Sequence, residues 1–241
     1  MSTPVPDESK RLSKVVAARV PCSRSEAERY ITEGWVRVDG VVVEEPQHRV
    51  STQRVDIDPR ANLQPVMPAT FLMHKPAGQG TVEALASMDA ATHWTGDSSG
   101  VRPVRSHRVR LVPLLELPAQ AEGLCVFSQD GRIVRKLRED AHLIEQELLA
   151  HVTGTLGEDG LARLREGLVL EGRALPPARV SWQSEARLRF AVKGIAPDWV
   201  PWMCSQVGLK LVGLKRIRIG RVPMAGLPPG QWRYLAPVER F

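Results

Sequence analysis

The chain has 241 residues, 43% of them hydrophobic, which is enough for one medium domain and a second, smaller one. A net charge of +6 and an isoelectric point near 9.6 favour a polyanionic partner. No apolar run is long enough to cross a bilayer, and the polar N-terminus lacks a signal-peptide core. The three cysteines lie far apart and form no C-x-x-C pair. These features argue against a membrane protein, a disulfide framework and a zinc site, and they predict a protein of the reducing cytoplasm.

The N-terminal segment carries clear helix and hairpin signals. Ser23 and Glu26 form a capping box, which predicts a helix running to about Glu33 and closed by Gly34. Before it, helical spacing relates Leu12, Val15, Val16 and Arg19. After it, the alternating stretch 35–43 around Asp39-Gly40 predicts a hairpin, and 55–58 a further short strand.

This order of helices and hairpin, in residues 9–59, resembles the S-four RNA-binding domain, named after ribosomal small-subunit protein four. The resemblance implies a basic face that grips structured RNA. By position, that face would consist of Arg11, Lys14, Ser23, Arg24 and Arg29. The alternative is that these are ordinary solvated charges, since acidic residues such as Glu26, Glu28 and Glu44 offset them.

Residues 60–69 contain proline and little periodicity, which is typical of a linker, and 70–238 form the main domain. Its first strand is expected at 71–75, followed by an extended loop with a short helix at 79–107. Further strands are expected at 124–128, 146–152, 179–182 and 187–192. Helices are expected at 133–137, 158–167 and 198–207.

Three motifs of the main domain occur in the order of a known family. Residues 71–78 match a strand and an N-K-P-x-G turn, with His74 in place of Asn. Residues 214–219 match L-x-R-x-R-I, and 226–235 match G-x-P-x-G-x-W-R-x-L. The chain thus resembles the ribosomal pseudouridine synthases of the RsuA and RluF type. The resemblance implies an α+β fold: a large mixed, mainly antiparallel sheet flanked by helices, with a cleft across its middle.

The family's catalytic loop is altered in this chain. Residues 113–124 follow the pattern P-x-G-R-L-D-x-x-x-x-G-L, in which the Asp is the nucleophile and the Arg its ion partner. Here the Gly is Leu115, the Arg is Glu116 and the Asp is Pro118. A proline side chain has no ionisable group and no lone pair for chemistry.

Two further implied active-site features are missing. The strand K-E-Y-x-V-x-V of the family aligns with 146–152, so its aromatic Tyr becomes Leu148. The family's basic late helix has Asp198, Pro201 and Trp202 in place of basic residues. Four coherent losses in one recognisable chain predict that catalysis has been lost.

Other residues are open to two interpretations. Lys215, Arg216 and Arg218 are expected either to contact RNA or to form a solvated face. Trp199 and Trp202 either stack on bases or, as their helical spacing beside Met203 favours, belong to the core. His74, His142 and His151 are interpreted as structural or surface residues. Four acids near Pro118 leave a relocated nucleophile open, with Glu116 as the foremost: Glu116, Glu122, Asp130 and Asp140.

Three functions follow from these observations. The first is a monomeric, catalytically degenerate homologue that binds structured, ribosomal RNA, without cofactor or metal. The second is an active RNA pseudouridine synthase that uses a relocated carboxylate. The third is a protein-interaction scaffold.

Overall fold

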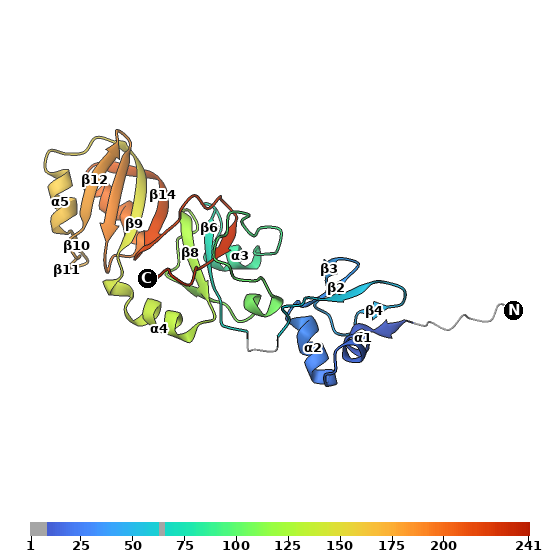
Figure 1. The fold of residues 1–241 in the computed structure, drawn as a ribbon. Helices are drawn as coiled ribbons and strands as arrows, with labels where there is room; N and C mark the ends of the chain where they lie inside the picture. The colour runs from blue at the N-terminus through green and yellow to red at the C-terminus, as the bar shows by residue number, and fades with distance from the viewer. Residues whose placement is uncertain (1–8, 63–65) are drawn as a thin grey trace. The chain divides into compact units, whose positions relative to one another are not determined.

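The computed structural model describes residues 9–62 and 66–241, in which the chain forms two compact units (Figure 1). The first unit contains the described residues up to Pro68 together with Arg102–Arg110. The second contains Ala69–Val101 and Leu111–Phe241. The chain therefore passes between the units three times. Part of the linker expected at 60–69 lies outside the described residues.

Two helices pack together in the first unit, α1 over Leu12–Arg19 and α2 over Arg24–Thr32. The predicted capping box is confirmed. The Ser23 hydroxyl accepts a hydrogen bond from the Glu26 amide at 3.2 Å, and the Glu26 carboxylate accepts one from the Ser23 amide at 2.7 Å. Gly34 follows with a φ of 70°, a conformation that ends helices and favours glycine.

Five short strands complete the first unit. The sheet order β3-β2-β5 joins Val41–Val42, Val36–Val38 and Val55–Ile57, and β1 (Lys10–Arg11) pairs with β4 (Arg49–Val50). Asp39 and Gly40 have φ values of 50° and 84°, as the predicted two-residue hairpin turn requires. The buried core of this unit includes Leu12, Val16, Ala27, Ile31, Val36 and Val55.

The segment Arg102–Arg110, with a 3-10 turn η1 at Arg105–Arg108, also belongs to the first unit. The Arg102 guanidinium lies 3.5 Å from the ring centroid of Trp35 and donates a hydrogen bond to the Glu33 carbonyl. This packing makes residues 102–107, the last six of the expected loop 79–107, part of the first unit.

The second unit is built on a nine-stranded mixed sheet in the described residues, in the order β12-β13-β9-β14-β8-β6-β16. Outside this order, β15 pairs with β14 and β7 pairs with β8. Only the β14–β8 pair of this described sheet is parallel. The strands are β6 Thr70–Lys75, β7 Val112–Leu114, β8 Glu122–Ser128, β9 Gln146–Gly154, β12 Arg179–Ser184, β13 Arg187–Val192, β14 Leu209–Ile219, β15 Val222–Pro223 and β16 Trp232–Tyr234.

Helices and turns connect these strands. The α-helices are α3 Thr81–Ala86, α4 Gly131–Glu139, α5 Gly160–Glu166 and α6 Val200–Ser205. The remaining elements are the turns η2 Ala141–Leu143 and η3 Pro197–Trp199 and the hairpin of β10 Val169–Leu170 with β11 Arg173–Ala174. The α+β class and the mainly antiparallel sheet agree with the sequence prediction.

Apolar side chains on the two faces of this sheet form two cores. Alternation along β6 sends Phe71 and Met73 into the larger core and Leu72 into the smaller one. Helix α6 contributes Met203 to the larger core, and α4 contributes Leu137 to the smaller core. Partly buried residues packed against the larger core include Trp199 and Trp202, as predicted for core residues.

Candidate functional site

The loop 115–121 between β7 and β8 contains Pro118, the residue that the resemblance aligns with the family's aspartate. Leu115 has a φ of 49°, a conformation that favours the glycine of the family pattern. Pro118 is half-buried and Glu116 is exposed. Since β7 ends at Leu114, Glu116 and Pro118 lie in the loop and not on a strand, so strand alternation does not place their side chains on the same side.

A buried lysine anchors this loop from within. Lys75 is fully buried, and its ammonium donates hydrogen bonds to backbone carbonyls. The acceptors are Pro76 at 3.0 Å, Gln79 at 2.6 Å, Ala119 at 3.3 Å and Ala121 at 2.6 Å. Burial lowers the pKa of Lys75 because it disfavours the charged form. The Lys75 ammonium, a group suited to pairing with a carboxylate, therefore donates to four peptide carbonyls instead.

Backbone contacts complete the support of the loop. The Thr81 hydroxyl donates to the carbonyl of Leu117 and accepts from its amide, both at 3.2 Å. The amide of Gly78 donates to Ala119 at 2.7 Å, and the amide of Ala121 donates to Pro118 at 3.0 Å. The loop is thus held by backbone amides, the Thr81 hydroxyl and the Lys75 ammonium, and residue 118 contributes only an aliphatic ring.

The implied tyrosine position lies in the core. Leu148 is fully buried in the larger core, next to Phe190 and Arg216 on the neighbouring strands. Leu149 is half-buried and, because side chains alternate along β9, points to the opposite face of the sheet. Leu148 therefore fills space rather than offering an aromatic ring to a base.

Leu149 lines an open cleft of about 490 Å³ across β9, β14 and the start of β8. Its charged or polar lining residues are Gln120, Glu122, His151, Arg187 and Lys215, and its apolar ones include Leu149, Val212 and Ile217. Pro118, Glu116 and Leu148 are not among the lining residues. Glu122 and Lys215 form an ion pair at 3.2 Å in this cleft.

Arg216, expected as an RNA contact, is fully buried. Its guanidinium donates to the Leu124 carbonyl at 2.8 Å and to Gln146 Oε1 at 2.8 Å, and lies 4.0 Å from the Cys125 sulfur. Burial lowers its pKa, and the sulfur of Cys125 partly opposes that shift. Such a side chain is not available to RNA, which corrects the sequence interpretation.

Arg218 is engaged by two acids. Its guanidinium contacts Glu145 and Glu147, each at 2.7 Å, and Arg179 and Arg189 pair with the same two carboxylates. Hydrogen bonds from Arg218 and Arg179 hold the pKa of Glu145 below its usual value, although its partial burial acts the other way. Arg218 therefore belongs to a charge network of the sheet, and its expected role in RNA binding loses support.

On the first unit, the expected basic face divides into two groups. Arg11 and Lys14 are exposed and have no ion pair among the described residues. Arg24 pairs with Glu28 at 3.1 Å, and Arg29 pairs with Glu33 at 3.3 Å. The Ser23 hydroxyl serves as the cap of α2. Arg11 and Lys14 are thus the cations that this face presents most freely.

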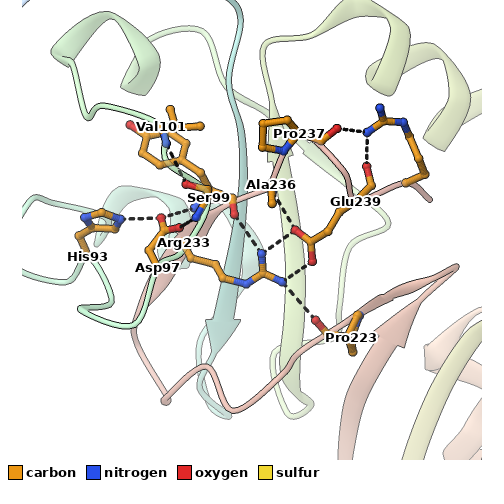
Figure 2. Close-up of polar contacts among 11 residues, drawn as sticks. His93, Asp97, Ser99, Val101, Pro223, Arg233, Ala236, Pro237 and Glu239 are labelled. Atoms are coloured by element: carbon orange, nitrogen blue, oxygen red, sulfur yellow. Dashed lines mark hydrogen bonds and ion pairs between the residues drawn. The ribbon is translucent and has the colours of Figure 1, made fainter.

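The motif near the C-terminus stabilises one edge of the sheet, as Figure 2 shows. Arg233 is buried and binds both carboxylate oxygens of Glu239, at 2.7 and 2.8 Å. Asp97 accepts hydrogen bonds from His93 Nε2 at 2.8 Å and from the Tyr234 amide at 2.9 Å. The His93 ring stacks on Trp232, with centroids 4.3 Å apart. Trp232 and Arg233 of this motif therefore have a structural role.

Two absences hold for the residues that the structure describes. Within 9–62 and 66–241, no three His, Cys, Asp or Glu side chains are grouped so that they could bind a metal ion. No helix in the same ranges is long and apolar enough to cross a membrane.

The acids near Pro118 differ in their surroundings: Asp130 caps α4 and pairs with Arg132 at 2.8 Å, whereas Glu122 faces the cleft.

Comparison with known proteins shows what the two units of this chain are similar to. Residues 10–55 match the S4 domain. The dual-specificity RNA pseudouridine synthase RluF of Escherichia coli (strain K12) is 26% identical over 240 residues, which cover 98% of this chain and 78% of RluF. The ribosomal large subunit pseudouridine synthase B of Bacillus subtilis (strain 168) is 27% identical over 236 residues, with 95% of this chain and 93% of that protein covered.

A crystal structure of a pseudouridylate synthase has the same fold, with a TM-score of 0.60 and 21% identity, over 94% of this chain and 96% of that one. The architecture is thus an S4 domain joined to a pseudouridine-synthase sheet. The chain is a homologue of the RluF- and RluB-type RNA pseudouridine synthases over nearly its full length.

Proposed function

We propose that this protein binds structured RNA through its S4 domain and does not convert uridine to pseudouridine. The observation that carries the proposal is Pro118 in the loop 115–121, at the position of the family nucleophile. The reaction needs an ionised carboxylate aimed at the sugar or the base. A proline ring supplies none.

The surroundings of Pro118 support the same conclusion. Glu116 replaces the arginine partner and is exposed, and Leu148 replaces the tyrosine and is buried in the core. The buried Lys75, which is bonded to the loop, donates its hydrogen bonds to backbone carbonyls. Removal of a nucleophile generally leaves only the small rate that derives from binding.

RNA as the partner is supported by the S4 match and by the activities named for the relatives, which act on RNA. Arg11 and Lys14 are exposed and have no ion pair within residues 9–62 and 66–241, and such cations suit phosphate groups. We extend the proposal to ribosomal RNA, to a monomer and to the cytoplasm, where the free cysteines Cys22, Cys125 and Cys204 would stay reduced.

A second candidate function is an active synthase with a relocated carboxylate. One observation favours Glu122 over Glu116 for that role, because Glu122 lines the cleft and is paired with Lys215.

Chemical mapping of pseudouridine separates the two candidates. Ribosomal and transfer RNA from cells with and without the gene should show the same pseudouridines. A site that depends on the gene and disappears in the Glu122→Gln variant would establish the active enzyme and remove the first proposal.

RNA binding itself is tested with a labelled RNA hairpin and the purified full chain at several salt concentrations. The double variant Arg11→Glu/Lys14→Glu should bind more weakly by roughly tenfold or more, with a flatter salt dependence, because two phosphate contacts are lost. Arg54→Glu, also on the first unit and exposed, is the matched control. Wild-type protein that binds no RNA would leave the protein-interaction scaffold as the function.

A further inference from the structure

We propose that His74 makes the segment 224–231 an acid-sensitive strap, which is closed over the sheet while the imidazole is neutral and opens when the ring takes up a second proton. The strap joins β15, which pairs with β14, to β16, which pairs with β6. Because β8 and β6 lie between β14 and β16 in the sheet, the strap crosses both strands. This inference concerns the conformation of the second unit and is independent of the proposed RNA binding.

Hydrogen bonds hold the strap at both ends and in its middle. At one end the amide of Met224 donates to the carbonyl of Ile217 at 2.8 Å, and at the other the amide of Gly230 donates to the carbonyl of His74 at 2.8 Å. Between these ends, Nδ1 of His74 lies 2.7 Å from the carbonyl oxygen of Leu227. Leu227 is buried. The imidazole of His74 therefore fixes the middle of the strap to β6.

This contact defines the protonation state of the ring. A carbonyl oxygen only accepts hydrogen bonds, so Nδ1 carries the proton of the neutral imidazole and Nε2 carries a lone pair. Nε2 is buried and has no hydrogen-bond partner within residues 9–62 and 66–241. His74 as a whole is only 1% exposed. A second proton would therefore create a buried, charged ring with an N–H that lacks an acceptor, which is costly.

The charged groups on the elements around the ring are already paired with one another. Glu122 on β8 and Lys215 on β14 act on the imidazole with opposite signs, and they form an ion pair at 3.2 Å. Arg233 on β16 projects from the same face of the sheet and is bonded to Glu239 at 2.7 and 2.8 Å. The strap itself contains no ionisable side chain. These surroundings do not compensate a charge on the ring.

The direction of the pH effect follows from this burial. Burial lowers the pKa of His74; the bond to Leu227 opposes that shift, Lys215 adds to it and Glu122 opposes it. A histidine with a lowered pKa in the folded state costs no stability above its unfolded pKa of about 6.5, and stability is lost as the pH falls from there toward the folded pKa. Opening the strap brings the ring into water, so the penalty is relieved by local opening without global unfolding.

The test is hydrogen exchange of the full chain, followed by mass spectrometry and corrected for the intrinsic effect of pH on exchange. In the wild type, the corrected rate of the peptide 224–231 should rise by about three- to tenfold between pH 7.5 and pH 5.5. His74→Asn has an amide donor in place of the imidazole and cannot take up a proton in this range, so its rate should change by less than about 1.5-fold. His142→Asn, which removes an exposed histidine of the same unit, is the control and should keep the wild-type rise.

Two results of the exchange experiment would overturn the inference. One is a corrected wild-type rate that does not change with pH. The other is a rise that persists in His74→Asn, because another group would then cause it. A measurement on the wild type alone covers the case in which His74→Asn does not fold: nitrogen NMR of the imidazole at pH 7.5 should place the proton of His74 on Nδ1. A proton on Nε2 would mean that the bond to Leu227 does not exist, and the strap would then have no sensor.

Discussion

Gly123 and Arg216 lie side by side where β8 and β14 pair in parallel, and their backbones approach too closely for any side chain at residue 123. Gly123 has a φ of 116°, and a Cβ there would lie 2.6 Å from the Arg216 nitrogen and nearer still to its carbonyl oxygen. The same short stretch of β14 buries the Arg216 guanidinium against Leu124. Glycine at this position therefore lets the two halves of the sheet join.

We expect Gly123→Ala to lower the free energy of unfolding by about 3 kcal/mol or more, because the methyl group meets backbone and the φ is strained. Urea denaturation of both proteins measures the difference. Gly131→Ala is the matched control, since its Cβ would enter open space at the start of α4. Equal stabilities of Gly123→Ala and the wild type would mean that β8 and β14 do not approach in this way.

Much of the fold follows from local signals in the sequence. The capping box at Ser23, the Asp39-Gly40 turn and the helix after Asp130 are each decided by residues within a few positions of one another. Such signals predict the type of an element well and its ends less well. The helix expected at 133–137 accordingly begins earlier, at Gly131, because Asp130 caps it.

The candidate site was less predictable because it depends on contacts between distant segments. Burial of Arg216 follows from three strands meeting around it, and a basic residue in an alternating strand gives no sign of that. The sequence pattern also did not reveal that Glu122, rather than Glu116, faces the cleft. That difference arises because the loop 115–121 is not a strand, and its path is set by the distant Lys75.

Arg102 should stabilise the S4 domain although it is far from that domain in sequence. In the full chain, Arg102→Ala should lower the unfolding free energy of the first unit by about 1–2 kcal/mol, since the contact with Trp35 and the bond to Glu33 are both lost. Tryptophan fluorescence during denaturation reports the change.

Arg105→Ala serves as the control for Arg102, because it removes only an exposed ion pair with Glu45. Its expected effect is at most about 0.5 kcal/mol. If the two variants were equally stable, the contact of Arg102 with Trp35 would contribute nothing beyond a surface charge.

Restoring the nucleophile alone should not restore catalysis. Pro118→Asp should give no measurable pseudouridine, because Glu116 stands where the arginine partner belongs and Leu148 where the tyrosine belongs. We expect that Glu116→Arg and Leu148→Tyr are also required. Leu148→Tyr places a larger, polar side chain in a filled core, at a cost of about 1–3 kcal/mol in stability.

Turnover is measured by pseudouridine mapping of ribosomal RNA incubated with each variant. The matched control is Pro118→Asn, because asparagine has nearly the shape of aspartate but carries no carboxylate. Activity of Pro118→Asp alone, absent from Pro118→Asn, would mean that the pocket is intact and that only the nucleophile is missing.

The Asp97 carboxylate should make the second unit sensitive to acid. Burial acts to raise the pKa of Asp97, but hydrogen bonds from His93, Tyr234 and Ser99 outweigh it, so the pKa of Asp97 lies below its usual value. An acid with a lowered pKa in the folded state stabilises it fully above its unfolded pKa. This contribution is lost as the pH falls below about 4 and through the folded pKa.

We therefore expect Asp97→Asn to be less stable than the wild type at pH 7, by about 1–3 kcal/mol for a part-buried acid that loses bonds to its donors. The difference should shrink as urea denaturation is repeated from pH 5 down to pH 3, because only the wild type loses the carboxylate's contribution. Asp198→Asn, which alters an exposed acid in the same unit, should show no such convergence. A stability difference that stayed constant over this range would show that the bonds to Asp97 do not depend on its charge.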